Sequence, residues 1–170
     1  MVRIRLLDET DARQYQALRL SALQHNPEAF GSTYEREVEF PLEQVGERLR
    51  PEQDRFVLGA FDEEGELIGM VVFMRETGAK FSHKGNVFGM YVEPESRGEG
   101  IGKLLLEELL KRAKRCEGLE QINLAVVSDN IAAKKLYSSM GFTIYGLERK
   151  ALKWQGRYFD EDWMVLQLYK

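Results

Sequence analysis

Three glycines within five residues, at positions 98, 100 and 102, separate an apolar run from a helical pattern. The apolar run, residues 86–92, is typical of a strand. From residue 101 to residue 113, apolar residues recur at the spacing of one helix face. A strand that enters a helix through such a loop directs several free N–H groups at one point, where the helix dipole adds positive potential. The spacing therefore predicts an anion site built from backbone.

The anion that suits this loop is a phosphate or pyrophosphate, with Arg97 and Lys103 as flanking charges. A plain tight turn is the alternative, although one glycine is usually enough for such a turn. Two common nucleotide loops fit poorly. A Walker loop needs Ser or Thr after its lysine, and here Leu104 follows; the dinucleotide fingerprint G-x-G-x-x-G has a different glycine spacing.

The loop closely resembles the cofactor loop of the GNAT (GCN5-related N-acetyltransferase) superfamily, which holds the pyrophosphate of acetyl-CoA. Arg97-x-x-Gly100-x-Gly102 carries the resemblance, with Tyr91-Val92-x-Pro94 before it. A second block, residues 130–142, is similar to the family's Asn-x-x-A-x-x-L-Y…G-F helix. The two blocks follow each other in the family's order and cover about a third of the chain.

The resemblance implies acetyl-CoA as cofactor and assigns a set of residues to its binding. That set is Met90, Tyr91, Val92, Arg97, Gly98, Glu99, Gly100, Ile101, Gly102, Lys103, Asn130, Ala133, Lys135 and Tyr137. The resemblance also implies that the strand through residues 90–92 splays from its neighbour. Its free amides would then bind pantetheine and polarise the acetyl carbonyl.

Acetyl transfer requires the acceptor amine to lose a proton and the departing thiolate of CoA to gain a proton or a hydrogen bond. Tyr137 is the candidate catalytic donor, because the resemblance places a tyrosine of this helix close to the cofactor sulfur. Packing in the core is the alternative role for Tyr137. Asn130 matches the family asparagine that hydrogen-bonds the pantetheine arm, and capping the following helix is its alternative role.

Glu93 is the candidate catalytic base, because it ends the strand beside the expected thioester. Its competitors are Glu35, Glu37, His83 and a chain of water molecules, and a plain surface position is the alternative for Glu93 itself.

Residues 29–40 interleave aromatic and acidic side chains without a clear period, which suits a loop over a pocket. In the GNAT family this region lines the acceptor site, so Phe30, Tyr34, Glu35 and Glu37 are predicted to bind substrate. The alternative is that the aromatic residues attach the loop to the core. The carboxylates predict a cationic acceptor.

The elements that position these residues are indicated by hydrophobic periodicity. Strands are predicted at residues 2–7, 56–61, 67–74, 87–92, 122–127, 142–145 and 162–168, and helices at about 10–26, 41–49, 101–113 and 130–141. Residues 146–160 are predicted to form a long polar connection. Together with the resemblance, this order implies an α/β (α+β) GNAT fold. Its mixed, mostly antiparallel sheet has six to seven strands, about four flanking helices and a V-shaped parting between the strands ending at Val92 and passing through Leu124.

Composition limits the remaining possibilities. The 170 residues are predicted to form a single domain, 1–170, with 24 basic and 28 acidic residues. This balance is unlike that of a nucleic-acid binder. One cysteine and two histidines exclude an intrachain disulfide and predict no metal cluster. No signal-peptide core or membrane-spanning run is present in the sequence, so a cytoplasmic protein without a membrane partner is predicted.

The sequence therefore predicts an N-acetyltransferase that transfers the acetyl group of acetyl-CoA to a primary amine of a small molecule, amino acid or peptide. Direct attack in a ternary complex is the expected route, and a homodimer is possible. Two alternatives are an acyl-CoA-binding sensor without catalysis and a protein N-acetyltransferase.

Overall fold

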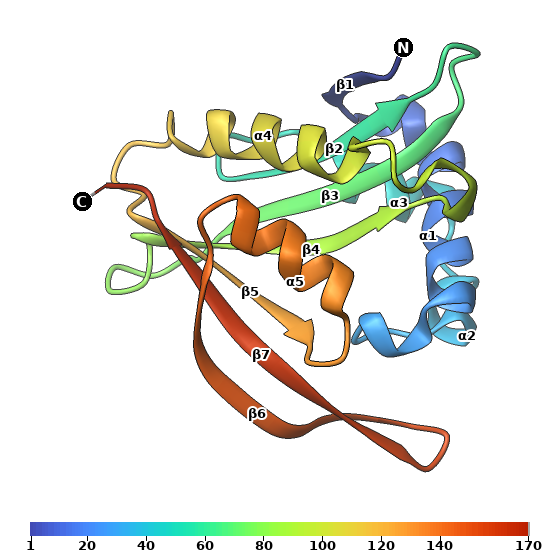
Figure 1. The fold of residues 1–170 in the computed structure, drawn as a ribbon. Helices are drawn as coiled ribbons and strands as arrows, with labels where there is room; N and C mark the ends of the chain where they lie inside the picture. Colours follow the sequence, from blue (N-terminus) through green and yellow to red (C-terminus); the bar gives the residue numbers. More distant parts are fainter. Residues whose placement is uncertain (170) are drawn as a thin grey trace.

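The computed structural model describes residues 1–169, which form a seven-stranded sheet with helices on both faces (Figure 1). The strands are β1 (Arg3–Leu6), β2 (Arg55–Phe61), β3 (Leu67–Arg75), β4 (Lys84–Val92), β5 (Gln121–Val127), β6 (Thr143–Trp154) and β7 (Arg157–Gln167). The helices are α1 (Ala12–His25), α2 (Tyr34–Glu37), α3 (Leu42–Leu49), α4 (Ile101–Ala113) and α5 (Ile131–Ser139). Single 3-10 turns lie at Glu9–Asp11, Pro27–Ala29 and Pro94–Ser96.

Strands β2 and β3 are buried on both faces, as their nearly continuous apolar sequence predicts. In β2, Phe56, Leu58 and Ala60 belong to a core shared with α4 and α5, whereas Val57 and Phe61 belong to a core shared with α1 and α3. Alternate side chains of one strand therefore hold helices on opposite faces of the sheet.

The sheet has the order β1-β2-β3-β4-β5-β7-β6, and all neighbours are antiparallel except β4 and β5. The two parallel strands pair only over Lys84–Asn86 and Gln121–Asn123 and then separate. Figure 1 shows the resulting V, with α5 lying across it. The predicted parting between these two strands is confirmed.

A bulge in β4 marks the point where the strands separate. Phe88 pairs with Val72 and Tyr91 pairs with Met70, so Gly89 and Met90 together oppose one residue of β3. Gly89 has φ +59°, a conformation that favours glycine. The extra residue bends the strand and changes the direction in which its backbone groups point.

The N-terminal helix begins later than the sequence suggests. The helix was predicted from about residue 10, but α1 starts at Ala12, after a 3-10 turn that Asp8 caps in a capping box with Asp11. Residues 29–40 are also more ordered than the predicted loop. They contain α2, whose N-cap Thr33 accepts a hydrogen bond from the Arg36 N–H.

The long polar connection predicted at 146–160 is wrong, because these residues extend β6 and β7 into one long hairpin (Figure 1). Its turn is Gln155-Gly156, both with positive φ, as in the two-residue turns that suit twisted strands. Most of β6 is exposed, so its sequence carries no alternation of buried and exposed residues. Within residues 1–169, no helix combines the length and hydrophobicity needed to cross a membrane.

Candidate active site

The loop between β4 and α4 presents a row of backbone donors. In the part of the chain that the structure describes, none of the N–H groups from Gly98 to Lys103 donates a hydrogen bond to protein. Gly98 and Gly100 have φ +84° and +80°, and a Cβ at either would meet no atom within 4 Å. Ile101 is buried and fixes the start of α4. The loop thus leaves its donors and the space in front of them open to an anion.

This loop borders a cavity of about 730 Å³, here called the loop cavity. Its lining includes Tyr91, Val92, Arg97, Gly98, Gly100, Ile101, Gly102 and Lys103, and from α5 and its cap Asn130, Ala133 and Leu136. Arg97 is held in place by hydrogen bonds to the Val92 carbonyl at 2.9 Å and to the Asn26 side-chain oxygen at 3.1 Å. Its guanidinium also lies over the Tyr91 ring. Unpartnered amides and a fixed cation fit a pyrophosphate.

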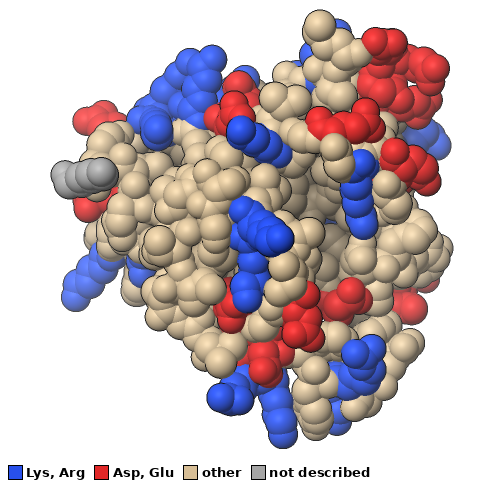
Figure 2. All heavy atoms as spheres, viewed as in Figure 1, with Lys and Arg blue, Asp and Glu red and all other residues tan. Residues whose placement is uncertain are grey.

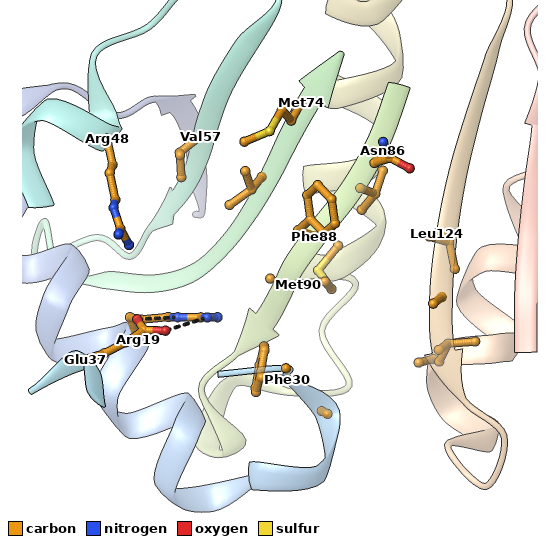
Figure 3. A pocket seen from close by; sticks show the side chains of 18 of the residues that line it. Arg19, Phe30, Glu37, Arg48, Val57, Met74, Asn86, Phe88, Met90 and Leu124 are labelled. Atoms are coloured by element: carbon orange, nitrogen blue, oxygen red, sulfur yellow. Dashed lines mark hydrogen bonds and ion pairs between the residues drawn. The ribbon is translucent and has the colours of Figure 1, made fainter. Parts of the chain in front are cut away.

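A second cavity, of about 920 Å³, occupies the V between β4 and β5 and is here called the central cavity (Figure 3). Figure 2 shows a hollow on this face of the molecule, with acidic and basic side chains around it. Both cavities are lined by Ala29, Phe30, Met90, Val127, Asn130 and Ala133. A ligand in the loop cavity can therefore extend to Met90 and meet a second ligand in the central cavity.

Tyr137 is buried at 7% exposure and lines the central cavity. Its ring packs edge-on against the ring of Phe142, with 5.9 Å between the two centroids. Tyr137 therefore also packs in the core, which was the alternative role considered for it. Burial raises the pKa of Tyr137 to about 12, which keeps the phenol protonated and able to donate a hydrogen bond. Asn130 likewise caps α5, because its side-chain oxygen accepts from the Ala133 N–H at 3.1 Å.

Arg19 and Glu37 form a bidentate ion pair in the wall of the central cavity, with both N–O distances 3.0 Å (Figure 3). Although burial opposes it, the hydrogen bonds from Arg19 lower the pKa of Glu37. The Arg19 guanidinium also lies over the Phe30 ring, with 4.9 Å to the centroid. Phe30 and Glu37 thus reach the cavity, but the charge of Glu37 is neutralised inside the protein.

Two further cations and two carboxylates line the central cavity without having been predicted, and one of these carboxylates, Glu76, directly follows β3. Arg48, near the end of α3, extends into the cavity over the Phe40 ring (Figure 3). Arg55 begins β2, and Glu161 lies on β7 across the cavity. Burial and the nearby Glu148 raise the pKa of Glu161. In sequence these are isolated charged residues, so no signal distinguished them from surface positions.

Five predicted site residues lie away from the cavity linings to which they were assigned. Glu93 lines neither cavity; burial and Glu95 raise its pKa, and His25 is near enough to oppose this shift. The exposed Glu99 and Lys135 are absent from the lining of the loop cavity.

Tyr34 and Glu35 border a separate depression beside Lys153 and Trp154 rather than the central cavity. The base role of Glu93 stays a prediction that its position does not favour.

The chain was compared with known proteins. The model of the acetyltransferase (GNAT) family matches residues 15–142. An L-methionine sulfoximine/L-methionine sulfone acetyltransferase from Pseudomonas paraeruginosa is 32% identical over 70% of this chain and 69% of its own. An L-amino acid N-acetyltransferase from Escherichia coli is 26% identical over 94% of this chain and 96% of its own.

Among solved structures, yncA from Salmonella typhimurium with its cofactor acetyl-CoA superposes with a TM-score of 0.78 at 26% identity. The match covers 100% of this chain and 95% of that one. The free amides of the loop and the cavity in front of them suit the same cofactor. The chain belongs to the GNAT acetyltransferase family, and it is an acetyl-CoA-dependent N-acetyltransferase.

Proposed function

We propose that this protein acetylates the amine of a free amino acid or of a similarly small amine, by direct attack in a ternary complex. The observation that carries the proposal is the junction of the two cavities at Met90, Asn130 and Ala133. A cofactor whose pyrophosphate lies on the loop amides would place its reactive end at this junction. The names of the relatives, which act on L-amino acids and methionine derivatives, support an acceptor of this size.

Acetyl-CoA, when bound, would supply the thioester: the amine nitrogen would bond to the acetyl carbon, the C–S bond would break, and CoA thiolate and one amine proton would be released. The bulged backbone of β4 at Gly89 and Met90 has no strand partner on the side of β5, so its polar groups are available to orient the acetyl carbonyl. Tyr137 donates a hydrogen bond toward the departing sulfur. Its pKa of about 12 exceeds that of an ordinary thiol, roughly 8.5, so the phenol stabilises the thiolate more readily than it surrenders its proton.

The amine proton needs an acceptor in the central cavity. Among the carboxylates of its lining, Glu37 is paired with Arg19, whereas Glu76 and Glu161 are half-buried and form no ion pair among the described residues. Glu76 lies beside Lys84, at the end of the V where β4 and β5 are paired, but Glu161 lies beside Val127, which lines both cavities. Glu161 is therefore the stronger candidate base by position, and Glu93 is its competitor.

The test is an acetylation screen with the purified protein, acetyl-CoA, the L-amino acids, L-methionine sulfone, polyamines and short peptides. Thiol release and the mass of each product are measured. An N-acetylated amino acid formed far faster than acetyl-CoA is hydrolysed without acceptor supports the proposal. Binding of acetyl-CoA without transfer to any acceptor would instead identify a sensor, and acetylation of peptides alone would identify a protein-modifying enzyme.

A further inference from the structure

Six charged side chains line the central cavity, and they differ in whether their charge is already paired. They are Arg19, Glu37, Arg48, Arg55, Glu76 and Glu161. Arg19 and Glu37 neutralise each other through two hydrogen bonds. The cavity wall formed by α1 and α3 therefore has a positive charge left over, which belongs to Arg48.

Arg48 has no carboxylate within 4 Å among residues 1–169. Its guanidinium lies 4.6 Å from the centroid of the Phe40 ring, which holds it in place by stacking and leaves its N–H edge unoccupied. Figure 3 shows Arg48 extending from α3 into the cavity, toward the same space as Arg19. The half-buried Tyr15 also lines this cavity.

Arg55 adds a second guanidinium to the cavity lining. Its Nε has no hydrogen-bond partner, but this atom is buried, with less than 1 Å² accessible, so a ligand in the cavity cannot contact it. The one carboxylate near the outer end of the guanidinium is Glu52, which lies 3.5 Å from Nη2 and is itself exposed. An exposed pair at this distance holds little of the charge of Arg55, which stays available to an anion.

We propose that Arg48, with the guanidinium of Arg55 as an additional donor, binds the α-carboxylate of the acceptor. This inference rests on the proposed transferase function and names the group that selects the substrate. A guanidinium presents two parallel N–H groups that match the two oxygens of a carboxylate. Apolar side chains of the cavity lining, among them Val57, Met74 and Phe88, would contact the side chain of the acceptor (Figure 3).

The opposite wall carries a carboxylate that is a candidate acceptor for the amine proton. Glu161 lies on β7 beside Val127, a residue shared by both cavities. The amine and the carboxylate of an α-amino acid are bonded to the same carbon, so they stay together and cannot each reach a different wall. The unpaired cation by itself therefore favours an acceptor that carries a negative charge and disfavours a polyamine.

The experiment compares each L-amino acid and L-methionine sulfone with its α-carboxamide, which keeps the amine and the side chain but removes the negative charge. We expect wild-type kcat/KM to favour the acid by about 10²-fold or more. In Arg48→Gln this ratio should fall by about 10- to 100-fold, mainly through a higher KM for the acid. Arg48→Lys should retain part of the preference, and Arg55→Gln should reduce it to a smaller extent.

Two matched variants control for indirect effects. Arg36→Gln also removes a guanidinium above Phe40, at 5.3 Å, but Arg36 does not line the cavity. Arg50→Gln removes an arginine at the end of α3 that pairs with Glu9 on the surface. Both should keep the acid-to-amide ratio of the wild type.

A wild-type ratio near one, or a ratio unchanged in both Arg48→Gln and Arg55→Gln, would overturn the carboxylate site while leaving acetyl transfer intact. Failure of acetyl transfer itself is distinguishable, because then neither acid nor amide is acetylated. In that case the Tm of the protein is measured with CoA and either the acid or the amide present. A rise in Tm with the acid but not with the amide, which is lost in Arg48→Gln, supports the site. Equal effects of acid and amide refute it.

Discussion

Replacing Gly100 by valine separates the backbone role of this glycine from its role in cofactor binding. Gly100 has φ +80°, and a Cβ there would meet no protein atom within 4 Å. The cost to folding is therefore backbone strain without a clash, roughly 1–2 kcal/mol. Gly100 lines the loop cavity beside the free amides, where the pyrophosphate is proposed to bind, and a valine side chain would take up part of this space. We expect the affinity for acetyl-CoA to fall at least tenfold, about 1.4 kcal/mol.

Gly65 provides a matched control in the turn between β2 and β3. It has φ +82°, and an added Cβ would again meet nothing within 4 Å, but Gly65 is not part of either cavity lining. Gly65→Val should lower Tm by a similar amount, roughly 2–4 °C per kcal/mol for a chain of this size, and leave the affinity unchanged. Calorimetric Kd values that agree within twofold between folded Gly100→Val and Gly65→Val would refute the phosphate site.

Three further predictions concern other residues of the fold and site. Tyr137→Phe should lower kcat by about 10²-fold, because the hydroxyl is lost. The affinity for acetyl-CoA should change little, because the ring still packs on Phe142. A kcat within a factor of two of the wild-type value would mean that the role of Tyr137 is structural. If Glu161 is the base, kcat/KM rises with pH as it ionises, and its raised pKa puts that rise above the usual range for a carboxylate. Glu161→Gln should abolish this rise of kcat/KM with pH. If the rise is instead abolished in Glu93→Gln and kept in Glu161→Gln, the base is Glu93. The Lys134 ion pair and the Ser128 hydrogen bond lower the pKa of the buried Asp162 in the folded protein. The charged carboxylate therefore stabilises the fold at pH values above its unfolded pKa of about 3.9. This stabilisation is lost as the pH falls through the lower, folded pKa. Asp162→Asn should cost roughly 1–2 kcal/mol near neutral pH and almost nothing at low pH, as measured by urea unfolding.

The cofactor half of the site was predictable because its residues are close together in sequence. The glycine loop and the start of α4 form one continuous stretch, and its free amides follow from local geometry alone. Tyr137 was predicted from the resemblance of residues 130–142 to a family helix, and these residues are also close together in sequence. Patterns of this kind depend on neighbouring residues in the sequence and not on how distant segments pack.

The acceptor half was not predictable, because it is assembled from elements far apart in the chain. Arg48 lies on α3 and Glu161 on β7, and each is a single charged residue in an otherwise ordinary segment. The β6–β7 hairpin was missed for a related reason. Strand β6 is largely exposed and β7 has no buried residue before Asp162, so burial imposes no period of two on this part of the sequence, and a polar strand is then indistinguishable from a polar loop. From Asp162 to Val165, β7 alternates buried and half-buried residues, and this part was predicted as a strand.

The number of acidic residues in a sequence segment does not give the charge of the cavity that the segment borders. Residues 29–40 are rich in glutamate, which predicted a cationic acceptor. In the fold, Glu35 lies outside the cavity lining and the charge of Glu37 is cancelled by Arg19, which comes from a different helix. Removing those two charges from the balance leaves Arg48 as the unpaired ion on that wall. Electrostatic selection depends on which charges remain unpaired at the cavity surface. The glutamates that predicted a cationic acceptor therefore do not set the charge of this wall, and the unpaired Arg48 favours an acceptor that bears a carboxylate.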